Sequence, residues 1–192
     1  MTLNSALTIL LSAMIVNNIV AHFGIGNVAL GENTKSSTFL VYSCIMFGVA
    51  TMFASICSFL LKTYVFDVYN LADFIILSEV LLALLPIFII GLIIYKKSKA
   101  SYFLLKDNTY LITFTAAVFG AVLFVMQSGT TLVDVCLYAL GTVMGFVLVN
   151  IILYTFSGYA RRNIQGFTPY LFNLLTLAII SLLFTTFSTI LV

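Results

Sequence analysis

The stretch VNNIVAHFGIGNVALG, from Val16 to Gly31, interrupts the first apolar segment of the chain with an asparagine pair, a histidine and three glycines. Glycine lets the backbone leave helical geometry, and a broken helix exposes N–H and C=O groups that lipid cannot satisfy. The side chains of Asn17 and Asn18 are suited to satisfy these groups or to line a pocket. The stretch therefore favours an interrupted membrane helix, and the alternative is that its glycines only allow close helix packing.

The composition of the chain indicates that it lies in a lipid bilayer. Of its 192 residues, 62% are hydrophobic and only 7% are charged, with a mean hydropathy of +1.21. Soluble domains carry about 25% charged residues, so a lipid bilayer is the medium in which this surface is stable. The three cysteines, Cys44, Cys57 and Cys136, lie in apolar segments without metal-ligand spacing and are expected to be packing residues.

Hydropathy divides the chain into six apolar segments, which predict six transmembrane helices in a single all-α domain covering residues 1–192. The segments are Leu3–Phe23, Thr38–Leu61, Leu71–Tyr95, Tyr110–Met126, Val133–Phe156 and Pro169–Val192. Most of them reach the roughly 20 residues that a helix needs to cross the bilayer, and the fourth is short.

The basic residues predict the orientation. Six spans put both termini on one side of the membrane, and seven of the eight Lys and Arg residues then lie in the first, third and fifth loops on the other side. These residues are Lys35, Lys96, Lys97, Lys99, Lys106, Arg161 and Arg162. The positive-inside rule places the basic loops 96–107 and 157–168 in the cytoplasm and both termini outside.

The two halves of the sequence resemble each other faintly. AHFGIG in the first span is similar to AVFGAV in the fourth, and CIMFGVATMF in the second span is similar to CLYALGTVMGF in the fifth. Units of about 1–97 and 98–192 with three crossings each would enter the membrane in opposite directions. This pattern predicts two inverted three-helix repeats, with interrupted helices one and four near the midplane.

Four stretches of the sequence, which cover nearly the whole chain in order, carry a resemblance to a known family. They are IVNNIVAHFGIGNVALGENTK, SYFLLKDNTYLITFTAAVFG, LYALGTVMGFVLV and LLTLAIISLLFTTFSTILV. The chain resembles the six-helix membrane subunits of the Rnf/Nqr electron-transport family, in particular the A subunit of the Rnf complex and the E subunit of the Na⁺-translocating NADH:quinone oxidoreductase.

The resemblance implies half-helices in spans one and four, a like-folded partner subunit, and a [2Fe–2S] cluster held by cysteines at the two half-helix tips. It also implies electron transfer between flavins, coupled to Na⁺ or H⁺ movement. The family cysteines fall near Gly26 or Asn27 and at Ala116, and none of these residues is a cluster ligand. His22 is the one imidazole nearby and is expected to be packed or hydrogen-bonded. We therefore expect no [2Fe–2S] cluster on this chain's own ligands, with a flavin possible in partner subunits.

Polar residues inside the spans are the remaining site candidates. Glu79 lies in the third span, and an ionisable group there indicates a cation ligand, a proton carrier or a contact between helices. Asn17, Asn18 and Asn150 also fall within spans and, with Glu79, are candidates for an ion or solute path. No catalytic residue and no metal site is predicted.

The sequence therefore predicts a membrane subunit of an Rnf/Nqr-like transmembrane electron-transfer complex, either a working or a non-catalytic part of an ion-translocating oxidoreductase. Its expected partners are a like-folded membrane subunit, further redox subunits and the lipid bilayer, and no nucleic acid. Two alternatives stay open: a small-solute or cation transporter or channel on the same inverted-repeat scaffold, and a structural subunit.

Overall fold

The computed structural model describes residues 3–24, 37–97, 108–163 and 169–191, and all regular structure in these ranges is helical. Three helical stretches are long and apolar enough to cross a membrane, judged by length and composition: Ser5–His22, Leu40–Tyr69 and Leu132–Tyr159. Shorter apolar helices cover Ile75–Ile89, Thr115–Ser128 and Leu171–Phe187. The prediction of an all-α membrane protein is confirmed.

The first half of the chain contains the three predicted spans, with turns of other helical types between α-helices. Its elements are α1 (Leu3–Leu11), the π-helical turn η1 (Ser12–Val16), α2 (Ile19–Phe23), α3 (Ser37–Leu61), the π-helical turn η3 (Lys62–Phe66), α4 (Asp67–Tyr69), the 3-10 turn η4 (Ala72–Phe74) and α5 (Ile75–Lys97). Asn70 adopts the left-handed conformation, with φ of 54°, and ends α4. Asparagine tolerates this conformation better than most residues, so the chain can turn there toward α5.

The second half contains three uninterrupted helices: α7 (Asn108–Ser128), α8 (Leu132–Asn163) and α9 (Pro169–Leu191). Thr131 caps α8, because Oδ2 of Asp134 accepts a hydrogen bond from the backbone N–H of Thr131 and Oγ1 of Thr131 accepts one from the N–H of Asp134. This reciprocal pair is a capping box, which supplies partners for N–H groups at the helix start. Pro169 begins α9, where its missing N–H costs nothing.

The prediction of an interrupted fourth span is wrong for the described residues, because α7 is one continuous helix from Asn108 to Ser128. Gly120 is the glycine that suggested a break, and it stays in helical geometry within α7. A single glycine weakens a helix by only about 1 kcal/mol relative to alanine, and no proline or capping asparagine follows it here. The interruption expected in the first span is confirmed and is described below.

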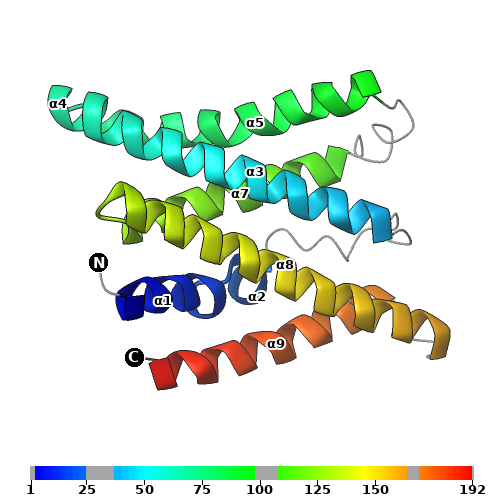
Figure 1. The fold of residues 1–192 in the computed structure, drawn as a ribbon. Coiled ribbons are helices and arrows are strands. Elements are labelled where there is room, and N and C mark those ends of the chain that lie inside the picture. The colour runs from blue at the N-terminus through cyan, green and yellow to red at the C-terminus, as the bar shows by residue number, and fades with distance from the viewer. Residues whose placement is uncertain (1–2, 25–36, 98–107, 164–168, 192) are drawn as a thin grey trace.

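The long helices lie roughly parallel or antiparallel to one another, and both termini lie at the same end of the molecule (Figure 1). The chain reverses direction between successive spans, so the three helices of the second half run opposite to their counterparts in the first. The predicted placement of both termini on one side agrees with this arrangement. The duplication of an ancestral unit stays a prediction.

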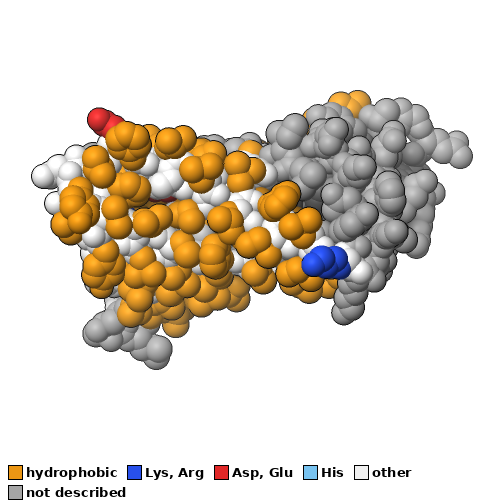
Figure 2. Space-filling view, turned by 90° about the horizontal axis from the view of Figure 1, so that it is seen from above, with side chains coloured by type: hydrophobic (Ala, Val, Ile, Leu, Met, Phe, Trp, Pro, Cys, Tyr) orange, Lys and Arg blue, Asp and Glu red, His pale blue; other side chains and the backbone are white. Residues whose placement is uncertain are grey.

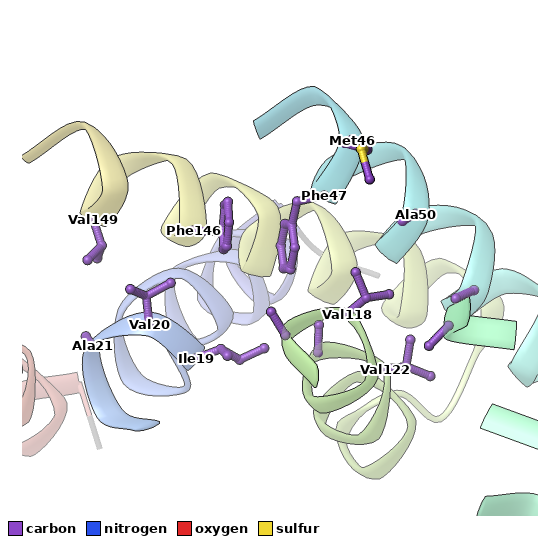
Figure 3. Packing of buried hydrophobic residues seen from close by; sticks show 14 of the residues in the cluster. Ile19, Val20, Ala21, Met46, Phe47, Ala50, Val118, Val122, Phe146 and Val149 are labelled. Carbon is purple, nitrogen blue, oxygen red and sulfur yellow. The ribbon is translucent and has the colours of Figure 1, made fainter. Parts of the chain in front are cut away.

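The centre of the molecule is an apolar core where α2, α3, α7 and α8 meet. Phe47 of α3 and Phe146 of α8 stack there, with ring centroids 3.8 Å apart and ring planes at 9° (Figure 3). Val20 of α2 and Val118 of α7 are fully buried in the same cluster. The short helix α2 is therefore held inside the bundle by apolar contacts on several sides.

The surface around this core is hydrophobic as well. Figure 2 shows one face whose described part is covered by hydrophobic side chains, with an acidic side chain at one end and a basic side chain toward the other. Exposed Ile76, Leu81 and Phe88 on α5 are typical of this surface. Contiguous apolar surface of this extent is stable against lipid and not against water.

Two glycines of α8 allow the first helix to approach it closely. A Cβ added at Gly141 would lie 2.6 Å from the carbonyl oxygen of Leu10, and one added at Gly145 would lie 2.5 Å from that of Met14. Both distances are too short for a real Cβ contact, so this approach requires glycine at both positions. Small residues at four-residue spacing are a common means of packing membrane helices.

We predict that Gly145→Ala lowers the stability of the protein by about 1–3 kcal/mol, because the added methyl group forces α8 away from η1. Gly158→Ala is the matched control on the same helix, since a Cβ at that position meets nothing within 4 Å. Thermal unfolding of both variants in detergent measures the effect. Equal midpoints for the two variants would show that the close approach is not required.

Candidate functional site: the break in the first membrane helix

The first membrane helix breaks at Asn17 and Asn18. α1 widens into the π-helical turn η1, whose last hydrogen bond joins the N–H of Asn17 to the carbonyl of Ser12 at 3.0 Å. Asn18 then takes an extended conformation, with φ of −72° and ψ of 115°, and α2 starts at Ile19. π-helical turns are frequent at functional sites because they redirect a helix without ending its hydrogen bonding.

The side chain of Asn18 satisfies backbone groups on both sides of the break. Its Oδ1 accepts hydrogen bonds from the N–H groups of Val20 and Ala21, both at 3.0 Å, and thereby caps α2. Its Nδ2 donates to the carbonyl of Met14 in η1 at 2.9 Å. Only 1% of Asn18 is exposed, so water is not needed as a partner for these groups. Asn18 thus satisfies backbone groups that the broken helix exposes, which is one of the two roles predicted from the sequence.

Asn17 connects the break to the next long helix. Its Nδ2 donates a hydrogen bond to the hydroxyl oxygen of Tyr138 on α8. Tyr138 is buried, and its carbonyl accepts a hydrogen bond from Oγ1 of Thr142 at 2.9 Å. A polar contact of this kind fixes the position of η1 against α8, in addition to the close approach at Gly141 and Gly145.

Gly24 ends α2 in the left-handed conformation, with φ of 66°, and its N–H donates to the carbonyl of Val20 at 3.0 Å. This is a helix C-cap that glycine adopts without steric cost. His22 lies in the last turn of α2 and is partly buried, and its Nε2 has no hydrogen-bond partner among the described residues. The expectation that His22 is packed agrees with this burial.

The other predicted path residues belong to other helices. Asn150 is fully buried on α8, and its Nδ2 donates to the carbonyl of Phe146 at 3.0 Å. Glu79 is on α5, with 3% of its surface exposed, and α5 packs mainly on α3 and α7. The break at Asn17 and Asn18 packs instead on α8 and α9, so the structure does not gather the four candidates into one site. A shared ion or solute path stays a prediction.

The positions that match the family cysteines do not carry metal ligands. Ala116 is exposed on α7, and Gly26 and Asn27 lie outside the described residues. The cysteines are on α3 and α8, where Cys44, Cys57 and Cys136 are partly buried. Within the described ranges no group of three His, Cys, Asp or Glu side chains is close enough to hold a metal ion. The absence of cluster ligands from this chain stays a prediction.

Several residues of the break were not identified from the sequence. Tyr138 gave no signal, because a tyrosine in an apolar segment has many ordinary roles. The four-residue spacing of Gly141 and Gly145 was a usable signal for close helix approach, but it did not reveal the partner helix.

The helical architecture and the apolar surface define an all-α integral membrane protein with a broken first helix. No family model matches the chain. It is similar to the A subunit of the ion-translocating oxidoreductase complex of Aliivibrio fischeri, with 27% identity over 179 residues that cover 91% of this chain and 89% of that protein. The corresponding subunits of Aliivibrio salmonicida and Aeromonas hydrophila are 27% and 28% identical, with the same coverage. Over most of its length the chain is therefore similar to the A subunits of ion-translocating oxidoreductase complexes, in agreement with the resemblance seen in its sequence.

We predict that Asn18→Ala destabilises the protein by about 1–3 kcal/mol, because it removes the cap of α2 and leaves the Met14 carbonyl unpaired. Asn18→Ser keeps an oxygen for the N–H groups of α2 but is too short to reach Met14, so its stability should lie between those of the wild type and Asn18→Ala. Thermal unfolding gives this order, and amide hydrogen exchange at Val20 and Ala21 reports the cap itself. Unchanged exchange at both amides in Asn18→Ala would contradict the capping role.

Proposed function

We propose that this chain is a membrane subunit of a transmembrane electron-transfer complex, in the position that the A subunit holds in ion-translocating oxidoreductases. The observation that carries the proposal is the similarity to such subunits over 91% of the chain, in the same order from end to end. The broken first helix supports it, because the resemblance to these subunits implies an interrupted first span.

We further propose that the chain supplies no ligand to an iron–sulfur cluster. Such a cluster requires thiolate or, more rarely, imidazole ligands, and the matched position Ala116 has neither. Electron carriers of the complex then belong to its other subunits, with a flavin among them, and a like-folded membrane subunit is the expected neighbour. The role of this chain is to build the membrane scaffold around them, which the buried, hydrogen-bonded Asn18 at the break supports.

Copurification from native membranes tests the proposed function. An affinity-tagged chain should bring down further redox subunits with a visible flavin or iron signal. A chain that purifies alone, without any redox signal, would contradict the proposed role and favour a transporter.

Removal of all three cysteines tests the ligand proposal separately. Cys44→Ser/Cys57→Ser/Cys136→Ser should leave the iron content and the EPR spectrum of the complex unchanged, because none of these thiols is expected to bind iron. Loss of iron on removal of any one cysteine would contradict the proposal.

Cysteine labelling tests the proposed orientation of the chain in the membrane. In a variant without native cysteines, Asp67→Cys should react with a membrane-impermeant maleimide in intact cells, and Lys99→Cys should react only after permeabilisation. This follows because Asp67 belongs to the side of the termini and Lys99 to a basic loop. The reverse labelling pattern would contradict the proposed orientation.

A further inference from the structure

The segment that joins α3 to α5 exposes large aromatic and apolar side chains. Tyr64 on η3 is 70% exposed, Val68 and Tyr69 on α4 are 64% and 69% exposed, and Phe74 on η4 is 54% exposed. The helix α4 lies at the end of the molecule where both termini are found (Figure 1). Exposed side chains of this size and kind indicate a surface that has a partner.

Backbone hydrogen bonds order this segment. The N–H of Asp67 donates to the carbonyl of Lys62. The N–H of Leu71 donates to the carbonyl of Phe66 at 3.0 Å, and the N–H of Phe74 donates to the carbonyl of Leu71 at 3.1 Å. The exposed side chains therefore project from a backbone that these bonds hold in place.

The length of α3 places the segment at the depth of the lipid headgroups. From Leu40 to Leu61 the helix rises by about 33 Å, which matches the roughly 30 Å of hydrocarbon in a bilayer. Lys62 is the first charged residue after this apolar stretch. The chain then turns back at Asn70 toward α5. Residues 63–74 thus lie beside the hydrocarbon and do not extend far into water.

The charges of the segment select among headgroups. Asp67 and Asp73 are exposed, whereas Lys62, the one basic residue between them and α3, is half-buried. Opposite charges attract and like charges repel, so this surface favours an ammonium group over an anionic headgroup. The basic residues that suit anionic lipids lie mostly in the loops predicted on the other side of the membrane.

The aromatic and acidic side chains are placed to act together. Tyr64 and Asp67 are three residues apart on a continuous helical stretch, and residues at this spacing are neighbours on a helix surface. An ammonium group is attracted to the face of an aromatic ring and forms charge-assisted hydrogen bonds with a carboxylate. Lys62, one turn earlier, offers its own ammonium to a phosphate.

We propose that the segment between α3 and α5 binds the headgroup of phosphatidylethanolamine. The ammonium of this lipid contacts Asp67 and the ring of Tyr64, and its phosphate contacts Lys62. Carboxylates accept hydrogen bonds from the N–H groups of ethanolamine, whereas choline has no N–H to donate. Because the segment turns back at headgroup depth, a lipid fits it better than a soluble protein does. The inference concerns the membrane surface of this chain and does not depend on the proposed redox role.

Lipid-dependent stability of the purified full-length chain tests this surface. Dioleoyl phosphatidylethanolamine added to the chain in a neutral detergent should raise the unfolding midpoint in a saturable manner, because a ligand that binds the folded state stabilises it. The glycerol and choline lipids with the same acyl chains should give a smaller shift. Asp67→Asn should raise the lipid concentration for half of the effect about tenfold, since it removes a charged hydrogen-bond acceptor. Tyr64→Leu should weaken binding while keeping an apolar side chain.

Tyr159→Leu is the matched control. Tyr159 is 60% exposed near the other end of the bundle, close in sequence to Arg161 and Arg162, and its replacement should leave the ethanolamine response unchanged. The proposal fails if phosphatidylglycerol or phosphatidylcholine stabilises the wild type as much as phosphatidylethanolamine does. It also fails if Asp67→Asn responds like the wild type.

Photo-crosslinking in native membranes distinguishes a lipid from a protein partner. Benzoylphenylalanine in place of Val68 should form an adduct with the mass of phosphatidylethanolamine, because this exposed side chain lies next to Asp67. A dominant adduct with another protein chain would overturn the proposal and assign the surface to a subunit contact.

Discussion

The structure depends on the satisfaction of backbone hydrogen bonds at a helix break inside an apolar bundle. Asn18 supplies an acceptor for two N–H groups of α2 and a donor for a carbonyl of η1. This double role is possible because α8 presents Gly145 beside it, where a Cβ would lie 2.6 Å from Nδ2 of Asn18. The broken helix and the glycine face of its neighbour therefore stabilise each other.

The break and the buried hydroxyls of α3 are polar regions that differ in hydrogen bonding. At the break, both the oxygen and the nitrogen of the Asn18 side chain are hydrogen-bonded to the backbone within the chain, which makes this residue a structural element. At Thr51, Ser55 and Ser58 the hydroxyl oxygens are buried and unused among the described residues.

Much of the fold follows from patterns in the sequence, and some of the site does not. The six apolar segments predicted the helices, and Asn17, Asn18 and the glycines predicted the break in the first of them. The same argument was wrong for α7, because Gly120 alone costs too little to end a helix that packs well. The separation of Glu79 from the asparagine pair was also not predictable, since hydropathy contains no information about which helices are neighbours.

The sequence by itself determined the lipid surroundings and the number of apolar helices, because these depend on composition and on length relative to the bilayer. The tertiary structure decided which polar side chains are caps and which remain unpaired. That distinction depends on the helix packed against each residue, as α8 lies beside Asn18. Residues of similar polarity in the sequence thus have different roles, since their partners come from distant parts of the chain.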